Sequence, residues 1–184
     1  KEALLMMMNR RSLLFTLALG TVLTLAPSAL ADEWISTGVA VRTKSIGFIS
    51  VNVYQIEHQV KVKKPTRSRQ AVIEHGETDK RFILTFLRDV PQKKIREAFA
   101  EALNKNGGSA AVGAVSGVFK DDGPDFAKGS QITVTFAAAN KSTTIVTPGG
   151  RTALNGDDHM KSVWKIWFGN IDQASIPEGL LSRL

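Results

Sequence analysis

The spacing of the apolar residues changes along the chain, and this change constrains the fold more than any other feature of the sequence. Val51 and Val53 belong to a segment in which apolar side chains recur at every second position, whereas Ile95, Phe99 and Leu103 are separated by four residues. The first spacing is typical of strands and the second of helices. Strands, then helices, then strands and a last helix predict an α+β domain, with helices on one face of an antiparallel sheet.

The same periods locate the elements along the chain. The predicted strands cover residues 34–42, 46–54, 60–63, 81–87, 130–136, 143–147 and 151–154. The predicted helices cover residues 91–105, 112–119 and 157–168, and a short final turn is expected after Pro177. Residues 64–68 are predicted to form a loop, and the strand at 60–63 is expected at an edge or on an exposed face.

The last predicted helix has the widest apolar stripe. Its apolar residues lie at i, i+3, i+4, i+7 and i+8, and they are Met160, Val163, Trp164, Trp167 and Phe168. This spacing places them on one side of a helix. We therefore expect this helix to pack its aromatic side against the sheet.

The N-terminal segment has the three parts of a cleavable signal peptide. Arg10 and Arg11 precede an uncharged, mostly apolar run over residues 12–25, and Ala29-Leu30-Ala31 supplies a small-x-small site. A membrane anchor is the alternative, but spanning a bilayer takes about 20 apolar residues. We expect removal of residues 1–31 after Ala31 by the secretory route rather than the twin-arginine route, and a single periplasmic or secreted domain over residues 32–184.

Composition excludes several kinds of chemistry. The chain has no cysteine, so disulfides, thiolate metal sites and cysteine nucleophiles are excluded. The three histidines lack the spacing of metal ligands, and no phosphate loop, dinucleotide fingerprint or nucleophile elbow is present. The sequence therefore predicts no metal site and no cofactor, and it identifies no catalytic residue.

The chain is basic. Its net charge is +7, of which residues 32–184 carry +5. Export argues against a nucleic acid as partner, so the charge is expected on a solvated surface near acidic lipids. The predicted contact with an anionic membrane, a peripheral one, uses the cluster Lys61, Lys63, Lys64, Arg67 and Arg69.

Two polar side chains are candidates for binding. Arg42 ends an apolar strand segment, and strand alternation leaves open whether it points inward or to solvent. A buried guanidinium needs an anionic partner, and its planar fork suits a carboxylate. Tyr54, the only tyrosine, ends the next predicted strand and joins a large apolar ring to one hydroxyl.

Several stretches together carry a resemblance to a known family. They are residues 37–42, 51–54, 84–90, 129–134, 147–150, 155–158 and 163–169. By their residues and order, the sequence resembles the chalcone isomerase-like family, in particular its exported bacterial members. The resemblance implies an open-faced β-sandwich, in which helices cover one face of a large antiparallel sheet and a ligand cleft lies between the layers.

The family includes enzymes that close a chalcone to a flavanone and members without known catalysis that bind fatty acids. Both groups share an arginine on an early strand, which Arg42 matches. The resemblance implies that this arginine faces the developing anion in the enzymes and holds a carboxylate in the binders.

The enzyme pattern is incomplete in this chain. Ile49 stands where the enzymes have a strand threonine, and Ile166 stands where they have a hydroxyl residue in the last helix. The helical tyrosine of the enzymes is missing, because Tyr54 lies on a strand. These changes remove donors that would orient a reacting anion, and they make the cleft more apolar.

Three functions follow from these observations. The first is a periplasmic, non-catalytic binder of a fatty acid or similar amphipathic carboxylate: Arg42 holds the carboxylate, Tyr54 adds a second contact, and the lining is Ile49, Phe86, Phe99, Trp164 and Trp167. The second is an isomerase or lyase of the chalcone isomerase type, in which Thr85, Thr133 and Thr135 are the candidate partners of Arg42. The third is a ligand-free protein-interaction module, which is favoured if side chains fill the cleft.

Overall fold

The computed structural model describes residues 33–62, 64–120 and 123–184. The predicted signal segment 1–31 lies outside the described residues, as does Lys63 of the basic cluster, so cleavage after Ala31 and the domain boundaries stay predictions. Within the described ranges, no helix is long and apolar enough to cross a membrane.

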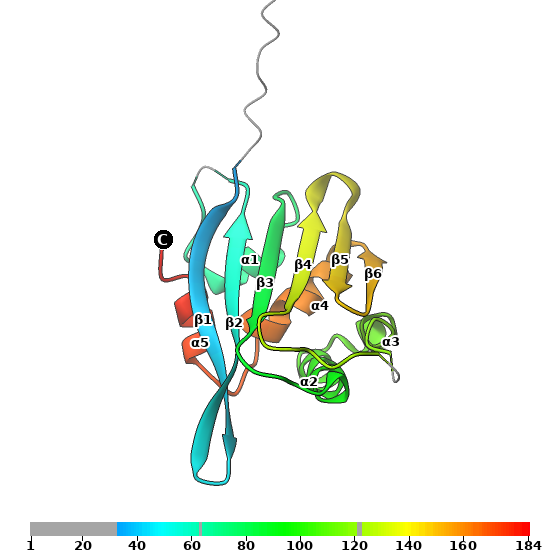
Figure 1. Cartoon of the computed structure of the whole chain (residues 1–184). Helices are drawn as coiled ribbons and strands as arrows, with labels where there is room; N and C mark the ends of the chain where they lie inside the picture. Colours follow the sequence, from blue (N-terminus) through cyan, green and yellow to red (C-terminus); the bar gives the residue numbers. More distant parts are fainter. Residues whose placement is uncertain (1–32, 63, 121–122) are drawn as a thin grey trace, which may run out of the picture. The chain divides into compact units, whose positions relative to one another are not determined.

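Six strands form one sheet in which each strand pairs with the next along the chain (Figure 1). They are β1 (Ile35–Ile46), β2 (Ile49–Val60), β3 (Lys80–Phe86), β4 (Gln131–Ala137), β5 (Ser142–Thr147) and β6 (Gly150–Asn155). Every pairing is antiparallel. The described helices are α1 (Arg69–Glu74), α2 (Gln92–Lys105), α3 (Ser109–Ser116), α4 (Asp157–Phe168) and α5 (Ser175–Leu180), and a 3₁₀ turn covers Ala138–Asn140.

One face of this sheet is covered and the other is open. In β3, Phe82, Leu84 and Phe86 are buried, whereas the residues between them are only half-buried. The helix α4 crosses the covered face, and Figure 1 looks onto the open face with α4 behind the strands. The predicted α+β class and open-faced sandwich are confirmed.

The boundaries of some elements differ from the prediction. β2 continues to Val60, so the separate strand predicted at 60–63 is wrong. The short helix α1 was not predicted; Ser68 caps it, since its side chain accepts a hydrogen bond from the backbone N–H of Ala71. α5 begins at Ser175, ahead of Pro177, because the first turn of a helix tolerates a proline.

A chain of buried hydrogen bonds ties the layers together. The indole Nε1 of Trp164 donates to Nε2 of His58 over 3.2 Å, and Nδ1 of His58 lies 2.7 Å from the hydroxyl of Thr37. That hydroxyl donates to the carbonyl of Leu180. Since Nε2 accepts, His58 is neutral with its proton on Nδ1, and burial, aided by the nearby Lys80 charge, lowers its pKa to about 3.

The backbone of α5 lies directly against β1. A side chain at Gly38 would collide with the carbonyl oxygen of Gly179 and with the backbone of Leu180. Only glycine permits this approach. The contact holds α5, and the segment that leads into it, against the edge strand that carries Arg42.

Candidate functional site

Arg42 lies on the covered face of the edge strand β1. Its Cα is paired with that of Tyr54 on β2, and the register shifts directly after this pair, between Arg42 and Thr43. The Arg42 side chain is 24% exposed, because it lies where the covered layer meets solvent. The question left open by strand alternation is thereby answered: Arg42 shares the face of Tyr54, not the open face.

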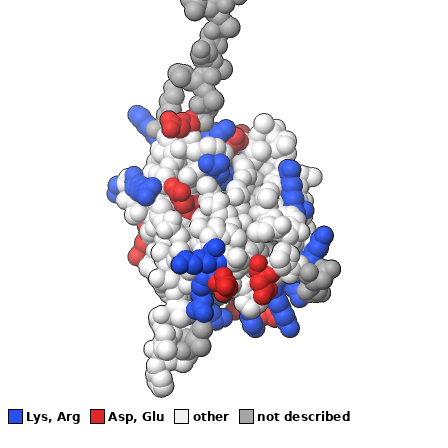
Figure 2. Space-filling view, viewed as in Figure 1, with Lys and Arg blue, Asp and Glu red and all other residues white. Residues whose placement is uncertain are grey.

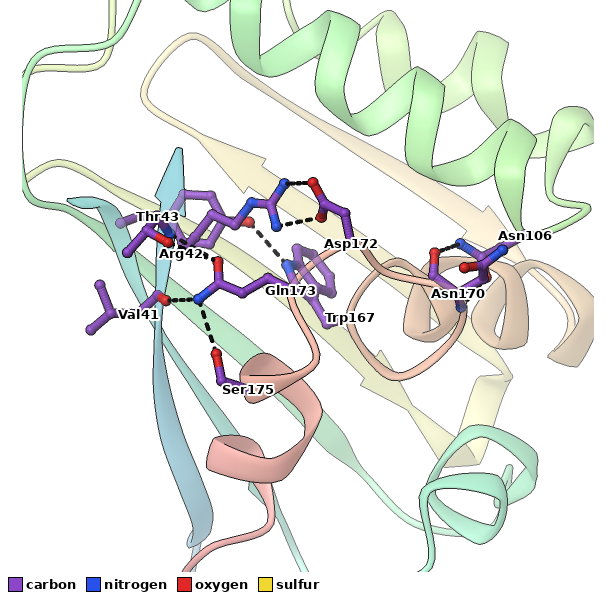
Figure 3. Close-up of polar contacts among 10 residues, drawn as sticks. Val41, Arg42, Thr43, Asn106, Trp167, Asn170, Asp172, Gln173 and Ser175 are labelled. Carbon is purple, nitrogen blue, oxygen red and sulfur yellow. Dashed lines mark hydrogen bonds and ion pairs between the residues drawn. The ribbon is translucent and has the colours of Figure 1, made fainter. Parts of the chain in front are cut away.

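The Arg42 guanidinium is bound to a carboxylate (Figure 3). Its two terminal nitrogens donate to the two oxygens of Asp172 over 2.6 and 3.0 Å. These bonds raise the pKa of Arg42 and lower that of Asp172, and the charge of Glu101 on α2 adds to the shift at Arg42. The Asp172 side chain is 66% exposed, so its carboxylate binds the Arg42 guanidinium from the solvent side.

The loop that carries Asp172 connects α4 to α5 and is fastened on both sides of that residue. On one side, the Gln173 amide accepts from the backbone N–H of Thr43 over 3.0 Å and donates to the carbonyl of Val41 over 2.9 Å. On the other side, the side-chain Oδ1 of Asn106 accepts from the backbone N–H of Asn170 over 2.7 Å. Its Nδ2 donates to the carbonyl of Asn170 over 3.3 Å (Figure 3). Gln173 therefore completes hydrogen bonds of the edge strand and places Asp172 beside Arg42.

Tyr54 lies between a polar margin, formed by Arg42 and its partner Asp172, and the layer of buried aromatic rings between sheet and helices. Its hydroxyl accepts a hydrogen bond from the indole Nε1 of Trp167 over 3.2 Å, and its ring meets Phe86 edge to face at 6.0 Å. Burial raises the pKa of Tyr54. Among the described residues, no hydrogen bond donated by this hydroxyl is found.

Aromatic rings fill the space between sheet and helices. The ring centre of Trp167 lies 4.5 Å from that of Phe82 and 5.6 Å from that of Phe99. Phe86 stacks on Phe126 with 4.5 Å between the ring centres. These rings are at most 4% exposed. In this structure the aromatic layer is packed, so a bound acyl chain would have to displace side chains.

The structure brings most of the predicted site residues together. Arg42, Tyr54, Phe86 and Trp167 lie around the polar margin, Phe99 packs behind Trp167, and Trp164 lies deeper, beside His58. Ile49 does not join them. It is 68% exposed at the start of β2, because this end of the strand extends beyond the neighbouring strand β3.

Sequence reasoning missed Asp172, Gln173 and Lys80. The first two lie between the last predicted helix and Pro177, in a stretch for which no element and no role was predicted. Lys80 precedes the predicted strand, although alternation through Phe82 and Leu84 would have placed it on the covered face. Lys80 is 1% exposed; its ammonium donates to the carbonyl of Val72 over 2.6 Å and lies 4.9 Å from the ring centre of Trp164.

No group of three or more potential ligand side chains that could hold a metal ion occurs among the described residues. The threonines considered as catalytic partners, Thr85, Thr133 and Thr135, alternate with buried residues of β3 and β4 and so lie on the open face, opposite Arg42. The described members of the basic cluster follow the end of β2 at Val60, and one of them, Lys61, is 3.8 Å from Asp79.

Comparison with sequence families matches residues 33–182 to the family described as chalcone isomerase-like. The chain belongs to this family, and its open-faced sheet and helices have the fold expected of it. Among solved structures, a fatty-acid binding protein from Arabidopsis thaliana matches with a TM-score of 0.63 and 17% sequence identity, covering 85% of this chain and 90% of that one. A search of curated proteins found no match.

Proposed function

We propose that this protein binds, without catalysis, a fatty acid or similar amphipathic carboxylate whose head group is held by Arg42. The observation that carries the proposal is the bidentate Arg42–Asp172 pair: the guanidinium already holds a carboxylate at the margin of an apolar layer. Arginine prefers this planar geometry for carboxylates. The name of the structural neighbour, a fatty-acid binding protein, supports the same ligand class.

Asp172 occupies the position that the ligand carboxylate would take. The ligand displaces the Asp172 side chain from Arg42, while Gln173 keeps the loop on the edge strand. Tyr54 then donates its unused proton to the incoming carboxylate. The exchange costs little, because exposed ion pairs contribute about 0–1 kcal/mol.

The acyl chain enters the layer beside Tyr54 and Trp167. Burial gains about 0.8 kcal/mol per methylene, but part of this gain is spent on moving packed rings. Affinity should therefore rise with chain length, and acetate should not bind. Thr85, Thr133 and Thr135, the candidate partners of Arg42 in an enzyme, lie on the open face, which supports binding rather than an isomerase or lyase reaction.

The test is calorimetry of the purified protein with acids from acetate through octanoate to stearate. Arg42→Ala should weaken binding by at least about tenfold, which corresponds to about 1.4 kcal/mol. Asp172→Asn should tighten binding several-fold, since it removes the competing charge. Arg81→Ala is the matched control and should change nothing, because Arg81 stacks on Trp34 on the open face.

Binding that survives Arg42→Ala would overturn the assignment of the head-group site. The packed aromatic layer favours a second function, a ligand-free protein-interaction module. If neither the wild type nor Asp172→Asn binds any acid of the series, the binder is excluded and the module takes its place.

We also propose that the protein is exported. Removal of the segment before Asp32 would produce a mature chain that begins at that residue, as its small-x-small site indicates. Intact mass spectrometry of protein recovered from a periplasmic extract checks this. Retention of residues 1–31, or recovery only from the cytoplasmic fraction, would contradict it.

A further inference from the structure

The hairpin of β1 and β2 extends past the rest of the sheet. The two strands pair as far as Ile46 and Ile49, whereas β3 pairs with β2 only as far as Tyr54. Residues 43–53 therefore form a two-stranded ribbon beyond the paired part of β3, and it projects from the sheet in Figure 1. The last backbone contact on the β3 side is at its base, where the N–H of Leu87 donates to the carbonyl of Val53 over 3.0 Å. An isolated ribbon gains little stability, so this extension does not serve the packing of the core.

Apolar side chains lie at the tip of this ribbon. Gly47 has a φ of +62°, which suits a two-residue hairpin turn, and the turn places Phe48 at its apex. Phe48 is fully exposed, and Ile49 is 68% exposed. Two large apolar side chains thus meet water at the most prominent point of the sheet.

The ribbon is nearly free of charge, but basic groups lie at its root. From Thr43 to Ile56 the only charged residue is Lys44. Figure 2 shows no Lys, Arg, Asp or Glu on the near face of the projecting part. A surface groove of about 510 Å³ at the root is lined by Val51, Asn52, Leu87, Arg88, Asp89 and Lys128.

The root of the ribbon is suited to anionic groups. Asp89, the only carboxylate of the groove, accepts a hydrogen bond from the backbone N–H of Lys128 over 2.8 Å, and the groove adds the cations Arg88 and Lys128. Val51 and Asn52 lie two and three residues beyond Ile49, which is about 7–10 Å along a strand. The apolar tip and the basic root are therefore separated by roughly the depth to which interfacial elements enter a bilayer.

We propose that the β1–β2 hairpin docks on an anionic lipid bilayer, with Phe48 and Ile49 inserted into the interface and Arg88 and Lys128 at the head groups. A convex tip fits a bilayer better than a protein, because a protein partner must match about 800 Å² of surface. A bilayer accepts isolated apolar side chains and attracts basic groups.

This docking surface differs from the basic cluster at 61–69. The hairpin tip and the cluster lie at opposite ends of β2, which runs from Ile49 to Val60 and is about 36 Å long at the usual rise per residue. A single flat bilayer meets one end or the other. The apolar tip favours the hairpin.

The absence of cysteine makes a local test straightforward. Phe48→Cys carries an environment-sensitive fluorophore, and vesicles of phosphatidylcholine with about one third phosphatidylglycerol are added to supply the anionic surface. We expect a blue shift and a rise in emission at position 48. The matched controls are Val62→Cys beside the basic cluster and Val146→Cys on β5, both exposed, and neither should respond.

A second variant measures the affinity. Phe48→Ser combined with Ile49→Ser should lower the partition of the protein onto these vesicles at least tenfold, whereas Val146→Ser should leave it unchanged. A response at position 62 and not at 48 would overturn the proposal in favour of the basic cluster. Silence at all three positions, or an unchanged partition of the double variant, would also overturn it. The assay needs no fatty acid, so its outcome is independent of the carboxylate site.

Discussion

Two cations lie on the covered face of the same sheet, and their surroundings differ. Arg42 is on the edge strand β1, is 24% exposed, and binds the carboxylate of Asp172. Lys80 is on the interior strand β3, is 1% exposed, and donates to the backbone carbonyl of Val72. It forms no ion pair with the described residues.

The electrostatic consequences are opposite. The ion pair raises the pKa of Arg42, whereas burial lowers the pKa of Lys80 to about 7. The partner of Arg42 is the exposed side-chain carboxylate of Asp172, which a ligand carboxylate would replace under the proposed function. The partners of Lys80 are a backbone carbonyl and the rings of Trp164 and Phe136, which cannot be exchanged. The exposed cation at the edge is thus the one suited to the proposed binding, and the buried cation supports the packing of the interior.

The largest expected change in stability comes from removing the Trp164 ring, which lies against the Lys80 ammonium. Trp164→Ala should lower the free energy of unfolding by about 3–5 kcal/mol, because it empties a large buried volume and breaks the hydrogen bond to His58. Urea denaturation measures this. Phe48→Ala, at the exposed hairpin tip, is the control and should stay within about 0.5 kcal/mol of the wild type. A loss below about 1 kcal/mol for Trp164→Ala would contradict a packed layer around Lys80.

The next effect is a pH dependence due to Lys80. Its pKa is about 7 in the folded state and about 10.4 in an unfolded chain, so the unfolded chain binds more protons between these values. The free energy of unfolding should rise with pH across that window. Below pH 7 the folded state carries the full cost of burying the charged Lys80. Lys80→Met removes this penalty on the folded state, so its stability relative to the wild type should fall by on the order of 4 kcal/mol from pH 6 to pH 10.

Denaturation curves at both pH values measure this difference, and constant packing effects of the substitution cancel. Lys161→Met is the control. Lys161 pairs with Glu74 at the surface, and this pair raises the pKa of Lys161. The stability of this variant relative to the wild type should therefore stay constant or rise with pH. If Lys80→Met shows no pH-dependent difference, Lys80 is not a buried charge and the contrast with Arg42 fails.

The smallest effect is expected at the Arg42 pair. Asp172→Asn should change the free energy of unfolding by no more than about 1 kcal/mol, because the pair is exposed to solvent. The pKa of Asp172 is lowered in the folded state, so this contribution is present above the usual aspartate pKa and is lost as pH falls below it. Denaturation at neutral and acid pH checks both statements. A larger loss would show that Asp172 is a structural group and not an exchangeable one.

Residue spacing predicted most of the fold. Alternation over residues 130–136 and the stripe from Met160 to Phe168 were enough to predict the covered face of the sheet and the helix that covers it. Residues 81–87 are apolar on both faces and predicted a strand covered on both sides, whereas one side of β3 is only half-buried. It missed α1, because six residues give too little periodicity to detect. It also divided β2 in error, because the alternation of Val60 and Val62 with lysines resembles a separate strand.

The candidate site was only partly predictable. Arg42 and Tyr54 were recognised by their residue types, and the register pairs them directly. The position of Ile49 was not predictable, since strand alternation gives the face of a residue but not whether a neighbouring strand reaches it. Lys80 was one residue outside the predicted strand, where its charge hid its place on the covered face.

What the sequence determined by itself is local: the periods of the strands and helices, the charge balance, the absence of cysteine, and the two residue types suited to a carboxylate. Only the tertiary structure decided which groups meet. Asp172 reaches Arg42 across 130 residues of sequence because the loop after α4 folds back onto β1, and Gln173 holds it there. No local pattern encodes such a contact, because it depends on how the whole covered layer packs against the sheet.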